Sequence, residues 1–158
     1  MHKQGIQVVN QFGAVEMKTA KKGDKIMSVI TWKYVKELQN EKAIDEFEKE
    51  HNFSYPQDLK LILINYNGGR PSSKYYDLAN EKDKEFKTLL SFNETDIENI
   101  YKCYPLDSSD KSLIPFASDP AGNYFVLKDN EIYLWYHEND YLRKINSTFT
   151  DFLNSLHD

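Results

Sequence analysis

The feature that most constrains the fold is a pair of aromatic and branched segments, at 123–127 and 132–136, separated by Lys-Asp-Asn-Glu at 128–131. Branched and aromatic residues favour strands, and Asp-Asn tolerates the left-handed backbone of a tight turn. The pattern therefore predicts a β-hairpin. Apolar side chains occupy both alternating positions of each segment, so the hairpin is either a central strand pair covered on both faces or an exposed sticky face.

Two further segments have apolar residues at i, i+3, i+4 and i+7, the spacing of a buried helix face. The first stripe is Leu59, Ile62, Leu63 and Tyr66. Pro56 suits the first position of this helix, and Asn-Gly-Gly at 67–69 supplies a left-handed cap at its end. The second stripe, after the capping segment Asn-Ser-Thr at 146–148, is Phe149, Phe152, Leu153 and Leu156.

The remaining elements follow from shorter patterns. Helical spacing predicts either two more short helices, one opened by Trp32 and one after Asn40, or one long helix with a break. The repeats are Trp32, Val35, Leu38 and Ile44, Phe47, His51. Strands are expected at 74–78 and 86–92, a short helix at 94–101, and an apolar run at 113–117 before a turn-rich segment. Helices first, then an antiparallel sheet, then a helix predict an α+β fold, with Trp32 and Phe152 as core rings.

Charge divides the chain near residue 27. The net charge is −5, but residues 1–26 carry +3 and the remainder carries −8. We predict a basic N-terminal extension over 1–26, with room for short strands at 6–8 and 15–17, and one folded domain over 27–158. A loosely attached leader, and a start at Met27, remain open alternatives.

Composition excludes several classes of protein. An acidic chain lacks the overall basic surface that direct nucleic-acid binding needs, although it suits a basic protein partner. The single cysteine, Cys103, offers neither an intramolecular disulfide nor a cysteine zinc site. No apolar run is long enough for a membrane span, and the amino terminus does not form a signal peptide. We therefore expect a cytoplasmic protein that does not enter membranes.

No catalytic arrangement stands out. None of the four histidines has a metal-binding spacing; they are His2, His51, His137 and His157. Cys103 is expected to be a small buried side chain, and the glycines at 68–69 follow a helix, where they cap it and do not bind phosphate. The sequence therefore predicts no catalytic residue, no metal ligand and no cofactor; a small hydrolase is the least supported class.

Several segments together resemble the SMI1/KNR4 family of the SUKH superfamily over residues 28–156. They are Trp32, Tyr-Pro-Gln-Asp-Leu at 55–59, Tyr-Asn-Gly-Gly at 66–69, Leu-Ile-Pro-Phe-Ala-Ser-Asp at 113–119, Gly-Asn-Tyr-Phe at 122–125, Trp-Tyr-His-Glu at 135–138 and Phe-Thr-Asp-Phe-Leu at 149–153. Tyr136 departs from the pattern, since family members often have an acidic residue there. Their order and spacing carry the resemblance more than any single motif.

The resemblance implies an α+β domain with a mixed sheet flanked by helices. Many bacterial members resemble immunity proteins, which bind and neutralise a cognate toxin, often a nuclease, and fungal members resemble regulators of cell-wall synthesis. We therefore expect a non-enzymatic immunity protein that occludes a basic toxin's active or substrate-binding surface. The alternative is a regulatory or scaffold module with an endogenous partner, and the oligomeric state stays open.

The expected partner-binding residues surround the predicted hairpin. Carboxylates close to aromatic residues in the sequence suit a basic partner, because charge complementarity speeds association and Tyr and Trp anchor interfaces. In the family, the loop near residue 119 borders the recognition surface. The predicted residues are Asp119, Asn123, Asp129, Glu131, Trp135, Glu138 and Asp140.

Overall fold

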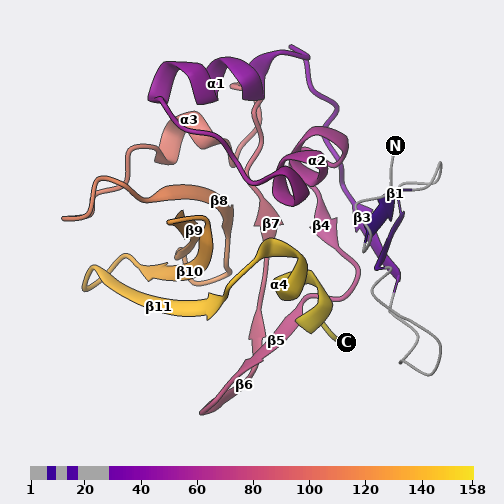
Figure 1. Cartoon of the computed structure of the whole chain (residues 1–158), viewed down its shortest axis with the longest axis vertical. Helices are drawn as coiled ribbons and strands as arrows, with labels where there is room; N and C mark the ends of the chain where they lie inside the picture. The colour runs from indigo at the N-terminus through magenta and orange to yellow at the C-terminus, as the bar shows by residue number, and fades with distance from the viewer. Residues whose placement is uncertain (1–6, 10–13, 18–28) are drawn as a thin grey trace.

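The computed structural model describes residues 7–9, 14–17 and 29–158 as four helices and eleven strands that form an α+β domain. The helices are α1 (Ala43–His51), α2 (Gln57–Asn65), α3 (Ile100–Cys103) and α4 (Phe149–Ser155). The five-stranded sheet has the order β11 (Tyr141–Asn146), β10 (Glu131–Tyr136), β9 (Tyr124–Lys128), β8 (Ile114–Ser118) and β7 (Thr88–Leu89). A second sheet has the order β1 (Gln7–Val9), β2 (Ala14–Met17), β3 (Val29–Lys33) and β4 (Arg70–Pro71). The hairpin of β5 (Tyr75–Leu78) and β6 (Glu81–Glu85) projects from the rest (Figure 1).

The β9–β10 hairpin is confirmed, and both its faces are covered. Asp129 and Asn130 have φ of 52° and 63°, the pair of left-handed residues that a two-residue turn of type I′ requires. Phe125 and Leu134 face the main core, whereas Val126 and Trp135 face a second cluster with Leu106 and Leu113. The hairpin is therefore a central strand pair and not an exposed sticky face.

The stripe of α2 is confirmed as a buried face. Pro56 precedes the helix as its N-cap, one position earlier than predicted. At the other end Gly68 has φ +69°, and the Gly69 N–H donates to the Tyr66 carbonyl at 2.7 Å. A Cβ on Gly69 would lie 2.8 Å from that same oxygen, so this close approach of the backbone requires glycine.

The final helix is also confirmed, together with its cap. Thr148 Oγ1 accepts from the Asp151 N–H at 3.0 Å. Asp58, in the first turn of α2, accepts from both the N–H and the hydroxyl of Thr150, at 2.9 and 2.7 Å, and so fixes α4 against α2. Phe152 is fully buried there, as expected of a core ring.

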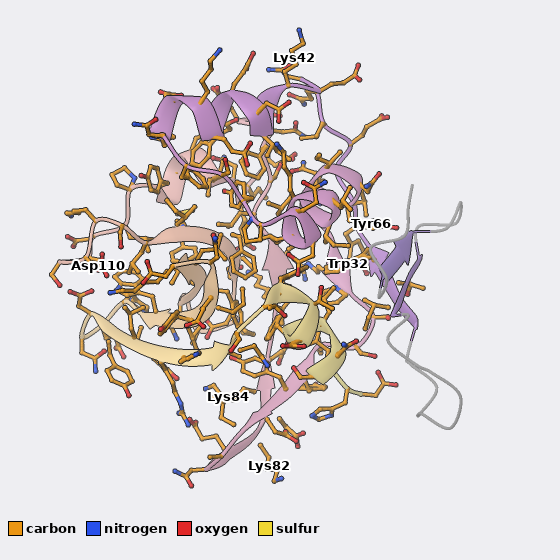
Figure 2. All side chains as sticks on the ribbon, viewed as in Figure 1. Trp32, Lys42, Tyr66, Lys82, Lys84 and Asp110 are labelled. Carbon is orange, nitrogen blue, oxygen red and sulfur yellow. The ribbon has the colours of Figure 1, made fainter. Side chains whose placement is uncertain are left out.

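The predicted helix opened by Trp32 is wrong, because Trp32 lies in β3. Residues 29–33 are mostly branched or aromatic, and Trp32 pairs with Pro71 of β4. Its ring is buried and stacks on Tyr66 at 5.8 Å between centroids (Figure 2). The chain turns at Tyr34, where φ is +57°, so the helical spacing of residues 32, 35 and 38 is coincidental.

Other predicted bounds change. The helix expected over 94–101 lies further along the chain, because α3 begins at residue 100 and extends to 103, and the strand over 86–92 is reduced to β7. The sequences of β6 and β11 do not alternate between apolar and polar residues, so the sequence does not predict these two strands. β6 reads Glu-Lys-Asp-Lys-Glu, and partnership with β5 alone holds it as a strand.

In the N-terminal region, β1 pairs with β2, and β2 pairs with β3. The boundary predicted between residues 26 and 27 lies outside the described residues, as do the lysines at 18, 21, 22 and 25. Within the residues described above, no helix has both the length and the apolar character that a membrane crossing needs.

Candidate partner-binding surface

Asp119 and Asn123, two of the predicted partner-binding residues, are buried and hold the loop between β8 and β9. Asp119 Oδ1 accepts from the backbone N–H of Ala121 and of Asn123, at 2.9 and 2.8 Å. The Asn123 side chain donates to Asp119 Oδ2 at 3.1 Å and accepts from the His137 N–H at 3.2 Å. Their polar atoms are therefore committed to the loop, and a partner cannot contact them as a free acidic surface.

Trp135 and Asp140 form a structural anchor. Trp135 is only 3% exposed, so burial in the second core cluster corrects its predicted place as an interface ring. Its indole N–H donates to Asp140 Oδ1 at 2.6 Å, and Asp140 also accepts from Ser108 Oγ and from the N–H and hydroxyl of Ser109. These hydrogen bonds, that of Trp135 first, hold the pKa of Asp140 well below its usual range.

The other three predicted residues do not form one acidic face. Glu131 pairs with Lys144 across the β10–β11 ladder, with 3.1 Å between Oε1 and Nζ. Asp129 and Glu138 are exposed but lie beyond opposite ends of β10. A six-residue strand spans about 20 Å, so these two carboxylates are neighbours only in the sequence.

A buried amide fixes three loops on another part of the molecule. Asn67, which follows α2, donates through Nδ2 to the Lys36 carbonyl at 2.8 Å and to Ser91 Oγ at 3.0 Å. Its Oδ1 accepts from the Phe92 N–H at 2.8 Å. Lys36 N–H in turn donates to the Asn67 carbonyl at 2.7 Å. One side chain thus connects segments 34–40, 67–70 and 91–99, which we call the three loops.

Asn93 completes the connection. It is 4% exposed; its Oδ1 accepts from the Gln39 N–H and its Nδ2 donates to the Glu37 carbonyl, both at 2.9 Å. Ser91 and Asn93 also donate to the carboxylate of Asp96. The buried side-chain amides of Asn67 and Asn93 use both their oxygen and their nitrogen in hydrogen bonds. These bonds give the three loops a fixed shape, as recognition loops on a rigid scaffold need.

An acidic hollow of about 430 Å³ opens between α1 and the loop at 91–99. Its floor contains Phe47 and Phe92, whose rings meet edge to face at 5.6 Å between centroids. Its rim contains three exposed carboxylates and a phenol, namely Glu46, Glu50, Glu94 and Tyr101. Partial burial, followed by the charges of these three carboxylates, raises the pKa of Tyr101.

A second hollow of about 520 Å³ lies on the other side of the same loop. Its lining is of mixed charge, because Glu98 pairs with Lys87 at 2.8 Å between Oε2 and Nζ. The other charged lining residues are Lys36, Arg70 and Asp96, and Ile97 beside them is 87% exposed. Arg70 also covers the ring of Tyr34, with 5.6 Å from Cζ to the centroid, and Tyr34 is 68% exposed. The loop at 91–99 therefore forms a ridge that carries the exposed side chain of Ile97, with the acidic hollow and this hollow of mixed charge beside it.

Sequence reasoning missed this surface, although one signal was present. Glu46 and Glu50 are like charges at i and i+4 on α1, a pairing that weakens a helix and therefore indicates a use outside it. Their approach to Glu94, more than forty positions away, follows only from the hydrogen bonds of the three loops.

Cys103, which the sequence places among the buried side chains, is only half-buried. Burial raises the pKa of its thiol to about 12, and the thiol contacts the carbonyls of Asn99 and Ile100. His51 packs between the rings of Phe47 and Tyr104. One group of metal-ligating side chains does come together among the described residues, and it consists of Asp77, Asp83 and His157.

Comparison with models of known protein families gives one family. A search of curated proteins returns no match. The model of the SMI1 / KNR4 family (SUKH-1) matches residues 40–155, from the last residues before α1 to the end of α4. That match takes in the helices α1 to α4, the five-stranded sheet and both hollows except Lys36 and Gln39. The chain therefore belongs to the SMI1/KNR4 (SUKH-1) family.

Proposed function

We propose that this chain is an immunity protein, which binds a cognate protein toxin in the cytoplasm and neutralises it without catalysis. The toxin is a nuclease, and binding occludes its active or substrate-binding surface. Membership of the SUKH-1 family, which includes immunity proteins, supports this function. The charge of −8 on residues 27–158 also supports it, because a basic nuclease would be attracted to such a surface.

The observation that carries the proposal is the acidic hollow. A nuclease binds phosphates through Lys and Arg, and the hollow offers such side chains carboxylates and an aromatic ring together. A guanidinium that enters between Glu46, Glu50 and Glu94 can pair with a carboxylate and lie against Tyr101. Filling the hollow would thus cover residues with which the toxin binds its substrate.

Ile97 on the ridge and Tyr34 on the neighbouring loop supply the apolar part of the same interface. Strong interfaces place a few large side chains at the centre, surrounded by polar contacts. Ile97 and Tyr34 are large and exposed, and they stand on loops that buried amides already hold in place. Little conformational entropy is lost when such a surface binds, so its contacts contribute more fully to affinity.

The first experiment identifies the partner. The protein is used as bait in an extract of the source cell, and the gene immediately upstream is examined for a large toxin. We expect one tight partner with a basic nuclease domain, whose activity one equivalent of this protein abolishes. Recovery of an endogenous protein and no toxin would contradict the immunity role and favour the scaffold alternative.

The second experiment locates the interface on this chain. The triple variant Glu46→Gln, Glu50→Gln, Glu94→Gln removes three charges; the new amide at position 46 can still accept from the Asn40 side chain, as the Glu46 carboxylate does at 2.9 Å. We expect weaker binding of the purified toxin, mainly through slower association, and reduced inhibition of its nuclease activity. The matched control, Asp129→Asn with Glu138→Gln, removes exposed carboxylates at the hairpin and should leave affinity unchanged. Full affinity in the folded triple variant would reject the hollow as the binding site.

A further inference from the structure

Three potential metal ligands meet where the chain after α4 crosses β5. His157 Nε2 lies 3.1 Å from Asp77 Oδ1 and 3.8 Å from Asp83 Oδ1. The three ligand atoms all lie within 4.8 Å of one another. Asp77 belongs to β5 and Asp83 to β6, so the cluster joins the β5–β6 hairpin to a residue 80 positions away from Asp77.

The backbone holds these side chains in place. His157 and Tyr75 form an isolated antiparallel bridge with two hydrogen bonds, of 3.1 and 2.8 Å. Asp83 N–H donates to Asp77 Oδ1 at 2.9 Å, and Asp83 has φ +56°, which turns β6 toward Asp77. The neighbouring Lys84 is engaged elsewhere, with Glu81 and above the ring of Tyr136, and it lies part-way along the hairpin (Figure 2).

The imidazole has the orientation of a metal-bound histidine. Its Nδ1 lies 3.1 Å from the backbone oxygen of Asp158, and an Nδ1–H that donates there leaves Nε2 directed at the two carboxylates. Histidines that bind metals donate their second N–H to such an oxygen, which fixes the tautomer. A proton on Nε2 can serve only one carboxylate oxygen, whereas a divalent ion can bind Nε2 and both carboxylates and neutralise their charges.

We propose that Asp77, Asp83 and His157 bind one divalent transition-metal ion of the zinc type. One imidazole nitrogen with two carboxylate oxygens suits Zn²⁺ or Co²⁺, and the nitrogen disfavours Mg²⁺ and Ca²⁺. The exposed side chains leave room for water at the remaining positions. The ion fastens the segment after α4 to the β5–β6 hairpin. The site lies apart from the two hollows, so it does not depend on the proposed function.

The test is titration of the tag-free full chain, freed of metal with EDTA and dialysed, with ZnCl₂ in a calorimeter. We expect one equivalent to bind, a higher midpoint of thermal unfolding, and visible absorption bands when Co²⁺ replaces Zn²⁺. MgCl₂ should give much weaker binding. Removal of a group that hydrogen-bonds to a metal ligand already lowers metal affinity by about 10- to 100-fold, so removal of a ligand itself should lower it at least as much.

Three variants each remove one ligand: His157→Gln, Asp77→Asn and Asp83→Asn. Asparagine at 77 can still accept from the Asp83 N–H, and asparagine at 83 tolerates the left-handed backbone, so both should fold. Each should lose the binding isotherm, the cobalt bands and the zinc-dependent thermal shift. The control is His137→Gln, an exposed histidine whose Nε2 contacts the Ala121 carbonyl, and it should bind Zn²⁺ as the parent does. Absence of zinc binding in the parent, or equal binding in the three variants, would overturn the proposal.

Discussion

At the scale of the residue, a carboxylate beside a tryptophan in sequence can have two opposite uses. Asp140 belongs to a sequence cluster that suited a partner surface, yet its oxygens accept four hydrogen bonds from Trp135, Ser108 and Ser109. Asp119 likewise binds its own loop. Sequence proximity identifies charge but not its neighbours in space, and the neighbours decide whether the charge is available.

Acid should therefore weaken the fold through Asp140. Because the folded state holds the pKa of Asp140 below its unfolded value of about 3.9, its contribution to stability is complete above that value and is lost as pH falls through the folded pKa. Asp110 acts in the same direction, since hydrogen bonds from Lys128 and Ser112 lower its pKa to about 2. We expect Asp140→Asn to be less stable than the parent at neutral pH.

The difference should narrow as pH is lowered from about 5 toward 2. The measurement is the midpoint of urea denaturation as a function of pH. Asp129→Asn is the control, since Asp129 is an exposed turn residue whose left-handed backbone asparagine also adopts. A constant difference between Asp140→Asn and the parent across this range would contradict the expected role of Asp140.

At the scale of the element, the sequence predicts those parts whose causes are local. The β9–β10 turn, the stripe of α2 and the Thr148 cap of α4 each depend on residues a few positions apart. β3, β6 and β11 depend on pairing with partner strands, which local spacing does not show. The spacing therefore predicts a helix at Trp32, and the sequence of β6 has no apolar pattern. For the same reason the sequence indicates only part of the acidic hollow. Two of its carboxylates lie on α1, whereas Glu94 lies on a loop that is held by hydrogen bonds to residues far away in the sequence.

The three loops should loosen together when one amide is removed. Asn93→Ala leaves the Gln39 N–H and the Glu37 carbonyl without their partner, and an unsatisfied buried polar group costs about 1–3 kcal/mol. We expect faster amide hydrogen exchange in segments 36–39 and 91–93, with the exchange of β9 and β10 unchanged. Thr95→Ala serves as the control, because its hydroxyl accepts only from the exposed Gln39 side chain. Equal exchange in Asn93→Ala and the parent would show that the amide does not fix the loops.

At the scale of the whole molecule, two sheets are joined through the residues that follow α2. The Leu89 N–H donates to the Gly69 carbonyl at 2.9 Å, where β4 of the four-stranded sheet meets β7 of the five-stranded sheet. In the four-stranded sheet β3 lies between β2 and β4, and β1 forms the far edge beyond β2 (Figure 1). The extension therefore shares hydrogen bonds with a strand that contributes to the core, through Ile30 and Trp32.

Deletion of residues 1–26 should thus lower the stability of the fold as well as change the net charge. It removes the strand that pairs with Val29, Ile30 and Thr31, and leaves β3 with an unpaired edge. We expect the shortened chain to unfold at a lower temperature and to self-associate at high concentration, as measured by thermal denaturation and light scattering. A variant with lysines 18, 21, 22 and 25 changed to glutamine keeps β1 and β2 and isolates the effect of charge. Unchanged stability and association in the shortened chain would mean that β2 contributes nothing to the fold.

The buried amides of the three loops also bear on how such a protein can diversify. Asn67 and Asn93 make the hydrogen bonds that shape the three loops, while the exposed side chains of Tyr34, Glu94 and Ile97 take no part in those bonds. Exchanging the projecting side chains therefore leaves the framework intact. If the proposed interface is used, mutation there would change which partner is bound at little risk to folding, so new specificities would arise by single steps on an unchanged scaffold.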